Sequence, residues 1–300
     1  MISFIMMAKN VENYIAEAVA ELQKENAISW ELIIIEDHSE DNTYEVVEKL
    51  AQFDERIILC KNPYRGKVLG TNFGFELSRG DIIKCIDSDD ILLCEFFKEY
   101  EKLKEYDAHC HSALIVDQNL NNLGKYNVNT ELITTSYENV VNNLLSLPKW
   151  SWSFKRNIAE KIFPMPANLP FEDVWMSIQI KKHALSVYNI QFPLYLYRQH
   201  DNQTFGGILN YNIERVVFRA KRLVALVEII KNEHKYLLEG VNEPFSTIKE
   251  FLELQINNAS IYAILSAKLS LRSKIKLILI LHFPSIAVSA TKLKWKLDKK

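Results

Sequence analysis

The sequence lacks a long apolar run, a metal-type arrangement of cysteines and a large net charge, and each absence excludes a class of protein. No stretch of about 18 apolar residues occurs, so no membrane-spanning helix is predicted, and the start MISFIMMAKN lacks the features of a signal peptide. None of the four cysteines forms a Cys-x-x-Cys pair, so we expect reduced thiols in a cytoplasmic protein. The formal net charge of −2 gives no indication of a nucleic-acid partner.

The charge is distributed unevenly along the chain. Residues 271–300 contain eight lysine and arginine residues but one aspartate, a local charge of +7 in a chain of net charge −2. This segment also carries an apolar stripe and Trp295, which suits a helix on an anionic membrane surface, where each basic residue contributes about 1 kcal/mol. A C-terminal helix that packs on the protein body and exposes its lysines accounts equally well for the pattern.

The first half of the chain contains a regular alternation of apolar runs and amphipathic helical patterns. Continuous apolar runs predict strands at 2–8, 31–37, 56–62 and 81–87, and helical periodicity predicts helices at 11–25, 42–53 and 70–80, with a further helix around 91–103. Such strands, separated by helices, indicate a mostly parallel α/β sheet that is covered on both faces.

The second half is less regular. Strand-like runs occur at 108–116 and 186–200, with a helical pattern at 134–146 between them. Beyond Gly206-Gly207 the pattern changes to long helices at 208–238 and 244–268, followed by the basic end. We therefore expect an α/β domain over residues 1–206 and a helical C-terminal region over 207–300.

Acidic residues collect at the carboxyl ends of two predicted strands, the edge at which α/β sheets bind ligands. Glu36 and Asp37 follow the second strand, and Asp87, Asp89 and Asp90 follow the fourth. Two like charges about 4 Å apart, at an effective dielectric of about 20, repel by about 4 kcal/mol, and a cation bound at the second cluster would relieve this repulsion. Carboxylates in this pattern suit Mg²⁺ or Mn²⁺. The alternative is an acidic turn that caps the following helix.

Four stretches, taken in order, resemble the inverting glycosyltransferases of family 2, which have the GT-A fold. They are ISFIMMAKNVENYI, the acidic stretch IIIEDHSEDNT, the segment GKVLGTNFGFELSRGDIIKCIDSDD with its Asp-x-Asp motif, and PFEDVWM. The resemblance covers about residues 1–205 and implies a GT-A fold with a C-terminal helical extension. Four residues depart from the family pattern. Met7 stands in place of a proline and Lys9 in place of an aromatic residue, whereas His38 stands in place of a glycine and Thr71 in place of an arginine. These departures leave the base of the donor open.

On the donor side, the resemblance implies that Glu36 and Asp37 border the nucleotide. Asp87 would approach the ribose or the metal-bound water, and Asp89 would bind the Mn²⁺ or Mg²⁺ ion that bridges the diphosphate. Lys67, which follows a glycine in a loop, is a further candidate for contact with the diphosphate.

The stretch YLYRQHDNQTF, residues 195–205, resembles a segment that closes over the diphosphate in related enzymes. Arg198 suits phosphate because its guanidinium can bind two oxygens at once. His200 is a candidate metal ligand or phosphate donor, with a packed or surface histidine as the alternative. Thr204 would add a hydroxyl group.

On the acceptor side, the resemblance implies that Asp173 is the general base that deprotonates the acceptor hydroxyl and that Glu172 orients the acceptor or the base. A carboxylate in this role should be partly desolvated, because burial raises its pKa and makes it a better proton acceptor. The apolar neighbours Phe171 and Trp175 are consistent with such a pocket. The alternative is an ordinary acidic helix start after Pro170.

Together these residues predict a metal-dependent inverting glycosyltransferase. We expect it to move a sugar from a nucleotide-sugar, with a UDP-sugar as the expected donor, to a hydroxyl of a glycan or lipid-linked acceptor during synthesis of a surface polysaccharide such as capsule or lipopolysaccharide. One alternative is a sugar nucleotidyltransferase, although the loop MAKNVEN has no glycine to cradle a triphosphate. Another is a non-catalytic scaffold that binds a nucleotide-sugar.

Overall fold

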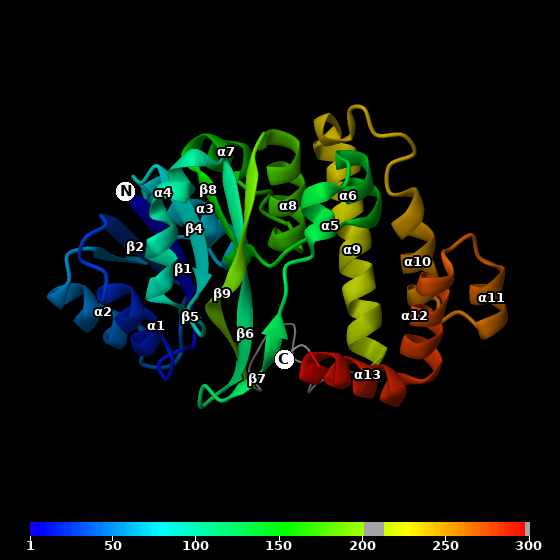
Figure 1. Ribbon diagram of the computed structural model, residues 1–300, viewed down its shortest axis with the longest axis horizontal. Helices are drawn as coiled ribbons and strands as arrows, with labels where there is room; N and C mark the ends of the chain where they lie inside the picture. The colour runs from blue at the N-terminus through cyan, green and yellow to red at the C-terminus, as the bar shows by residue number, and fades with distance from the viewer. Residues whose placement is uncertain (201–212, 298–300) are drawn as a thin grey trace.

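The computed structural model of the protein describes residues 1–200 and 213–297, in which a nine-stranded mixed sheet is flanked by helices (Figure 1). The strands are β1 (Ile2–Ala8), β2 (Trp30–Glu36), β3 (Ile57–Lys61), β4 (Ile82–Asp87), β5 (Ile91–Leu92), β6 (Ala108–Asp117), β7 (Asn122–Tyr126), β8 (Trp152–Lys155) and β9 (Val187–Gln199). Their order across the sheet is β3-β2-β1-β4-β8-β6-β9-β5, and β7 pairs with β6.

The helices of the first 200 residues lie between these strands. They are α1 (Ile15–Gln23), α2 (Thr43–Phe53), α3 (Lys67–Leu77), α4 (Tyr100–Glu105), α5 (Thr130–Thr134), α6 (Tyr137–Asn143), α7 (Arg156–Ile162) and α8 (Glu172–His183), with short 3-10 segments η1 (Cys94–Glu99) and η2 (Lys149–Ser151). After residue 212 the chain is helical, with α9 (Ile213–Glu233), η4 (Lys235–Leu238), α10 (Ser246–Ile256), α11 (Ile261–Ser266), α12 (Leu271–His282) and α13 (Pro284–Leu297).

Strands β3, β2, β1 and β4 form the parallel part of the sheet. Strand β1 pairs in parallel with both β2 and β4, so that Ile5 lies opposite Ile33 on one side and Cys85 on the other. Phe4 and Met6 point into a core cluster that contains α1 and η1, whereas Ile5 points into the cluster that contains α7 and α8. Because both faces are covered, most positions of these strands are apolar, which explains the continuous runs in the sequence.

Helix α3 lies very close to β1 because two of its residues are glycines. A methyl group at Gly70 would lie 2.3 Å from the terminal carbon of Met7, and one at Gly74 would lie 2.6 Å from Ile5. The end of the Met7 side chain can move aside, but a side chain at Gly74 would meet Ile5 and push the helix away from the strand. The close packing brings the start of α3, with Lys67, next to the carboxyl end of β4.

The sheet changes direction beside β4. This strand pairs in parallel with β1 on one side and antiparallel with β8 on the other. Strand β8 continues antiparallel to β6, and β6 runs parallel to β9. The carboxyl end of β4 consequently lies close to β9, where the N–H of Asp87 donates a hydrogen bond to the Tyr195 hydroxyl at 3.0 Å. In open α/β sheets, ligands bind beyond the carboxyl ends of the strands at the point where the strand order reverses, which in this sheet lies between β1 and β4.

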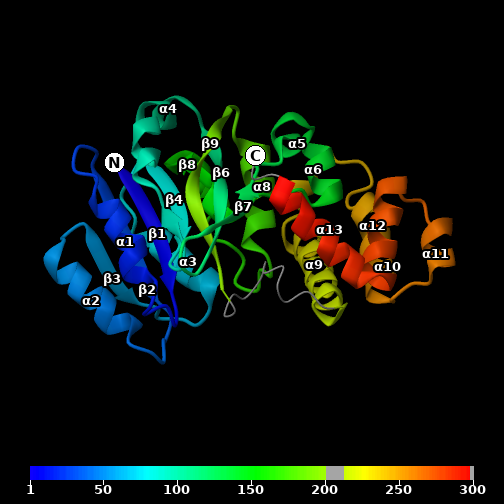
Figure 2. The same cartoon turned by 60° about the horizontal axis from the view of Figure 1, so that its bottom comes forward.

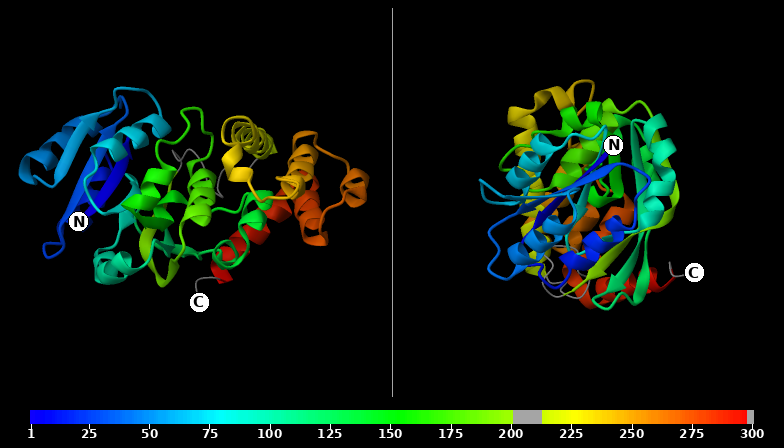
Figure 3. Two further views of the ribbon diagram at one scale, coloured as in Figure 1. Left: turned by 90° about the horizontal axis from the view of Figure 1, so that it is seen from above. Right: turned by 90° about the vertical axis from the view of Figure 1, so that its left-hand side faces the viewer.

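The C-terminal helices pack in two groups: α9 packs against the sheet domain, and α11 and α12 pack against each other. Leu226 and Ile230 of α9 lie in the same core cluster as Trp175 of α8, so the predicted sheet domain and helical region share a core. Helices α11 and α12 build a separate small cluster that includes Ile264 and Leu277. Figures 2 and 3 show α10, α11 and α12 at the end of the molecule far from β3, with α13 returning toward β7. The predicted boundary at residues 206–207 lies outside the described residues.

The structure confirms the alternating strands and helices expected for residues 2–87, with ends that shift by up to four residues. The prediction of a helix around 91–103 is wrong for residues 91–99. Residues 91–92 form β5, which pairs with β9, and residues 94–99 form η1, which places Phe96 and Phe97 in the core. The pattern at 244–268 forms two helices, since Asn258 adopts a left-handed φ of 46° after the end of α10.

Candidate active site

Asp87 ends β4, and its carboxylate is held by two lysines from distant parts of the sequence. Its Oδ1 lies 3.1 Å from Lys67 Nζ on α3 and 3.2 Å from Lys149 Nζ in η2. Burial alone would raise the pKa of Asp87, but the ammonium groups of Lys149 and Lys67 outweigh it and hold that pKa well below its usual range. Asp87 is therefore ionised at any physiological pH.

The other two acids of the turn are accommodated differently. Asp89 Oδ2 lies 3.1 Å from Nε2 of His200, directly after β9. Asp90 accepts the main-chain N–H of Arg198 at 2.7 Å, and burial together with the charges of Asp89 and Asp87 raises its pKa well above the ordinary value. One carboxylate thus faces lysines, one faces a histidine and one favours its proton. Groups of this chain itself relieve part of the repulsion that the sequence predicts.

Two of the three predicted metal ligands come together here. Asp89 and His200 are in contact, whereas the carboxylate of Asp87 faces lysines instead. The Asp89 side chain is 24% exposed, and Nδ1 of His200 is buried without a hydrogen-bond partner in the described part of the chain. Mg²⁺ and similar ions are commonly held by one or two protein ligands together with substrate phosphates. This donor pair fits a divalent ion of that kind.

Helix α8 begins with Glu172 and Asp173, and both are linked to the end of β4. Lys149 Nζ lies 3.7 Å from Glu172 Oε2, and the main-chain N–H of Lys149 donates to Asp173 Oδ1 at 2.9 Å. The Thr71 hydroxyl on α3 lies 3.3 Å from Glu172 Oε1. Burial raises the pKa of Asp173 to about 6; the hydrogen bond from Lys149 opposes this rise, and the charge of Glu172 adds to it. An ionised Asp173 is therefore a stronger base than an exposed aspartate.

Asn72 joins α3 to the loop that leads into α8. Its Nδ2 donates to the main-chain oxygen of Met165 at 2.8 Å, and its Oδ1 accepts the N–H of the same residue at 2.8 Å. The sequence gives no sign of this pairing, because the two residues are 93 positions apart. The helix that carries Lys67 thus also fixes the approach to Glu172 and Asp173.

Glu36 and Asp37 are buried at the end of β2 and organise the neighbouring loops. Asp37 Oδ1 accepts hydrogen bonds from Asn62 Nδ2 at 2.6 Å and from the N–H of Gly66 at 3.1 Å. Glu36 Oε1 accepts the N–H of Ser39. The bonds to Asp37 shape the loop directly before α3, and the bond to Glu36 shapes the turn after β2. The contacts of both acids with a nucleotide stay predictions.

His38 stands where the family pattern has glycine, and its backbone explains that preference. Its φ is 57°, in the left-handed region that glycine adopts most readily. The imidazole Nε2 lies 2.9 Å from the main-chain oxygen of Tyr64 and so ties this turn to the loop before α3.

Arg198 has partners other than the predicted diphosphate. Its Nε donates to the main-chain oxygen of Asp89 at 2.8 Å, Nη1 to that of Gln118 at 2.9 Å, and Nη2 to the Glu17 carboxylate at 2.6 Å. The residue is 2% exposed, so the guanidinium anchors the acidic turn from inside. The predicted contact of Arg198 with the diphosphate stays a prediction. Thr204 lies outside the described residues.

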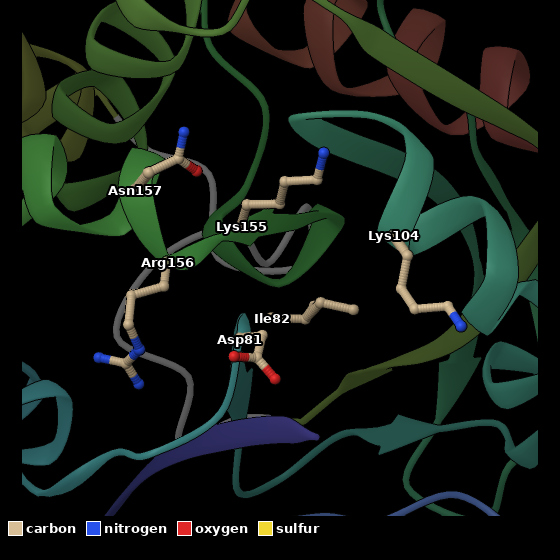
Figure 4. A pocket seen from close by; sticks show the side chains of 6 residues that line it. All are labelled: Asp81, Ile82, Lys104, Lys155, Arg156 and Asn157. Carbon is tan, nitrogen blue, oxygen red and sulfur yellow. The ribbon is translucent and has the colours of Figure 1, made fainter.

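Two other candidate features lie away from this site. A hollow of about 270 Å³ opens at the beginning of β4, at the end of the strand opposite Asp87 (Figure 4). Its lining residues are Asp81, Ile82, Lys104, Lys155, Arg156 and Asn157. Glu21, Cys94 and Glu95 bring three ligand atoms within 4.8 Å of one another between α1 and η1, but Glu21 is already paired with Lys24. Neither feature includes Asp89 or Asp173.

Comparison with solved structures gives the fold. The structure of S. aureus TarS 1-349 in complex with UDP-GlcNAc superposes with a TM-score of 0.56 at 16% identity, covering 97% of this chain and 89% of that one. The mannosyltransferase PcManGT from Pyrobaculum calidifontis, in complex with GDP-Man and Mn²⁺, gives a TM-score of 0.58 at 12% identity, covering 99% of this chain and 83% of that one. The predicted GT-A fold is confirmed.

Sequence comparison gives the family. Putative glycosyltransferase EpsH of Bacillus subtilis is 24% identical over 222 residues, 66% of this chain and 61% of that protein. UDP-Glc:alpha-D-GlcNAc-diphosphoundecaprenol beta-1,3-glucosyltransferase WfgD of Escherichia coli is 34% identical over 92 residues, 30% of this chain and 36% of that protein. The chain thus matches less than two thirds of the length of either relative. The family model "Glycosyl transferase family 2" matches residues 3–163, which is more than half of the chain, and the chain belongs to this family.

Proposed function

We propose that the protein is a metal-dependent inverting glycosyltransferase that moves a sugar from a nucleotide-sugar to a hydroxyl group of a glycan or lipid-linked acceptor. The observation that carries this proposal is the position of Asp173, a carboxylate with a raised pKa, next to the acidic end of β4. The TarS and PcManGT structures are complexes with UDP-GlcNAc and GDP-Man, and the name of WfgD includes UDP-Glc. These relatives support a nucleotide-sugar donor. We favour a UDP-sugar, and synthesis of a surface polysaccharide as the pathway.

The residues divide the reaction between two sides of the site. Asp173 takes the proton of the acceptor hydroxyl as its oxygen attacks the anomeric carbon, and Glu172 orients the acceptor. One displacement then inverts that carbon without a covalent enzyme intermediate. Lys67, whose side chain is 52% exposed, is free to turn from Asp87 toward the leaving diphosphate. Asp89 and His200 would hold Mn²⁺ or Mg²⁺, which when bound draws negative charge from the leaving group.

A donor screen tests this proposal directly. The wild type is incubated with UDP- and GDP-sugars, with Mn²⁺ or with a chelator, and release of the nucleoside diphosphate is measured. We expect release with one donor class in the presence of Mn²⁺, its loss in the chelator, and a strong reduction in Asp89→Asn. Binding of a nucleotide-sugar without release would favour a scaffold instead. Formation of a nucleotide-sugar and pyrophosphate from a sugar phosphate and a nucleoside triphosphate would favour a nucleotidyltransferase.

We also propose that α12 and α13 contact an anionic membrane surface on which a lipid-linked acceptor is presented. Leu271, Ile275 and Ile286 are each at least half exposed, beside the basic residues of this segment. In the described ranges no single helix has the length and hydropathy of a span; only residues 271–282 and 284–290 together reach it, across a bend of 119°.

Liposome co-sedimentation tests this second proposal. We expect binding to vesicles with an anionic lipid and weaker binding by a variant lacking residues 271–300 and by Arg272→Glu/Lys274→Glu. Equal sedimentation of all three proteins would favour helices that pack on the body and only expose their lysines.

A further inference from the structure

Lys149 contacts both sets of acidic residues, and nothing in the sequence pattern singles it out. Its side chain is 4% exposed. Its ammonium group lies 3.2 Å from Asp87 at the end of β4 and 3.7 Å from Glu172 at the start of α8. Its main-chain N–H binds Asp173 at 2.9 Å. A single residue thus joins the donor side of the site to the acceptor side by three contacts.

The main chain around Lys149 is fixed from beneath by a second buried lysine. Lys84 of β4 is fully buried, and its Nζ donates to the main-chain oxygens of Trp150 at 2.6 Å and Trp152 at 3.2 Å. The Trp150 ring also stacks on Tyr195 with a centroid distance of 4.7 Å and an interplanar angle of 7°. Lys149 therefore starts a segment that is bound to β4 and β9 and cannot shift independently of them.

We propose that Lys149 is a positioning residue of this site, which holds the carboxylate that ends β4 and the two carboxylates that begin α8 in one fixed arrangement. The labels "donor side" and "acceptor side" rest on the proposed function. The contacts of Lys149 with Asp87, Glu172 and Asp173 are observed independently of it. A buried ammonium group is costly unless carboxylates compensate it, and removing one partner of such a pair leaves the other charges buried and unpaired. Lys149 is nearly inaccessible, whereas the half-exposed Lys67 can leave Asp87.

The arrangement predicts which kinetic step depends on Lys149. Reacting groups that are misplaced by about 1 Å can lose about 100-fold in rate. We expect Lys149→Met, which keeps the length of the side chain, to lower kcat by about 100-fold with a change in donor KM of less than about threefold. Lys149→Arg, which keeps the charge, should recover at least about tenfold of that loss. The matched control is Lys155→Met in the same segment, which should retain the wild-type kcat.

A double-mutant cycle gives a readout that needs no activity. The free energy of unfolding is measured for Lys149→Met, Glu172→Gln and the double variant, each by denaturant titration. We expect the double variant to be less destabilised than the sum of the single variants, because the second substitution removes a carboxylate that the first leaves unpaired. Additive effects would overturn the proposal, since the two residues would then not act as a unit.

The two measurements separate failure of this inference from failure of the proposed function. If the wild type releases nucleotide from no donor while the cycle shows coupling, the proposed function fails and the linking role of Lys149 stands. If the wild type turns over and Lys149→Met behaves like Lys155→Met, the proposed function stands and the inference about Lys149 is overturned.

Discussion

Strand β4 ends with a carboxylate and helix α8 begins with two, yet the protein treats the charges on the two sides of its site in opposite ways. Asp87 is surrounded by the ammonium groups of Lys67 and Lys149, which hold its pKa below the ordinary range. Asp173 receives a main-chain N–H but no close side-chain cation in the described part of the chain, and burial raises its pKa to about 6. One carboxylate is kept charged, and the other is kept basic.

The difference matches the roles proposed for these two residues. A carboxylate beside a diphosphate and a metal ion needs a permanent charge, whereas a general base is most effective when its pKa lies near the working pH. Nearby charge and burial are separate ways to set a pKa. Nearby lysines lower the pKa of Asp87, burial raises the pKa of Asp173, and Lys149 contacts both residues. Substitutions at the two ends should therefore have different, even opposite, consequences.

The largest effect is expected from Asp173→Asn. An amide cannot accept the acceptor proton, and loss of a general base lowers a rate by about 10²–10⁴-fold, so we expect kcat to fall by about 1,000-fold. Binding of the nucleotide-sugar, measured by calorimetry, should change little because the donor side is intact. Glu172→Gln is the neighbouring control and should cost less. Retention of wild-type kcat in Asp173→Asn would remove this residue from the mechanism.

The second prediction concerns the free energy of unfolding, which should fall in Asp87→Asn and rise in Asp173→Asn. Because the pKa of Asp87 is lowered in the folded state, its stabilising contribution is present above the unfolded pKa and is lost as the pH falls through the folded value. At pH 7.5 Asp87→Asn should lower the free energy of unfolding by about 3 kcal/mol, the lower end for breaking a buried ion pair. Guanidinium chloride titration measures this change.

Asp173→Asn should instead stabilise the protein at pH 7.5. A raised folded pKa gives a contribution that is present below the unfolded pKa and lost as the pH rises through about 6, so ionised Asp173 costs stability at neutral pH. Each pKa unit corresponds to about 1.4 kcal/mol, which sets an upper limit of about 3 kcal/mol on the gain. A melting temperature that falls in both variants would contradict the contrast between the two ends.

Much of the fold can be predicted from the sequence, because the apolar runs of β1, β2 and β4 must be covered on both faces. Where prediction fails, tertiary contacts decide the local structure. The residues after the acidic turn form η1, since Phe96 and Phe97 pack against Phe4 from β1, a contact that no local periodicity encodes. The break after α10 is a local feature instead, because it coincides with the left-handed backbone of Asn258.

The acidic half of the site can be predicted from the sequence, and the basic half largely cannot. Asp87, Asp89 and Asp173 occupy short recognisable motifs. Lys149 lies in the least regular part of the chain. The pairing of β4 with β8 and the hydrogen bond of Lys84 to Trp150 bring its segment to Asp87. The guanidinium of Arg198 binds main-chain oxygens and Glu17, and the sequence does not indicate these partners.

The third prediction tests how the two ends are held together. Asn72→Ala removes both hydrogen bonds to Met165 and leaves a buried N–H and a buried carbonyl oxygen unpaired, so we expect a loss of about 2–3 kcal/mol of unfolding free energy. The rate should fall with it, because the loop before Asp173 loses its anchor on α3. Asn129→Ala, which removes an exposed helix cap, is the control and should cost about 1 kcal/mol without a change in kcat. Equal rates in the two variants would limit Asn72 to a structural role.

The smallest effect is a change of rate with pH, and it reports on Asp173 alone. Only the ionised carboxylate accepts a proton, so kcat should fall about tenfold for each pH unit below about 6. Asp87 does not contribute in this range because its pKa lies far lower. A histidine also adjoins the site, so His200→Gln is compared in the same titration. The fall of kcat below about pH 6 should persist in His200→Gln. It should disappear in Asp173→Asn, because the residual activity of that variant does not depend on the carboxylate. If the fall of kcat instead disappears in His200→Gln, the pH dependence arises from His200, the proposed metal ligand. Burial of Asp173 would then not set the pH range of activity.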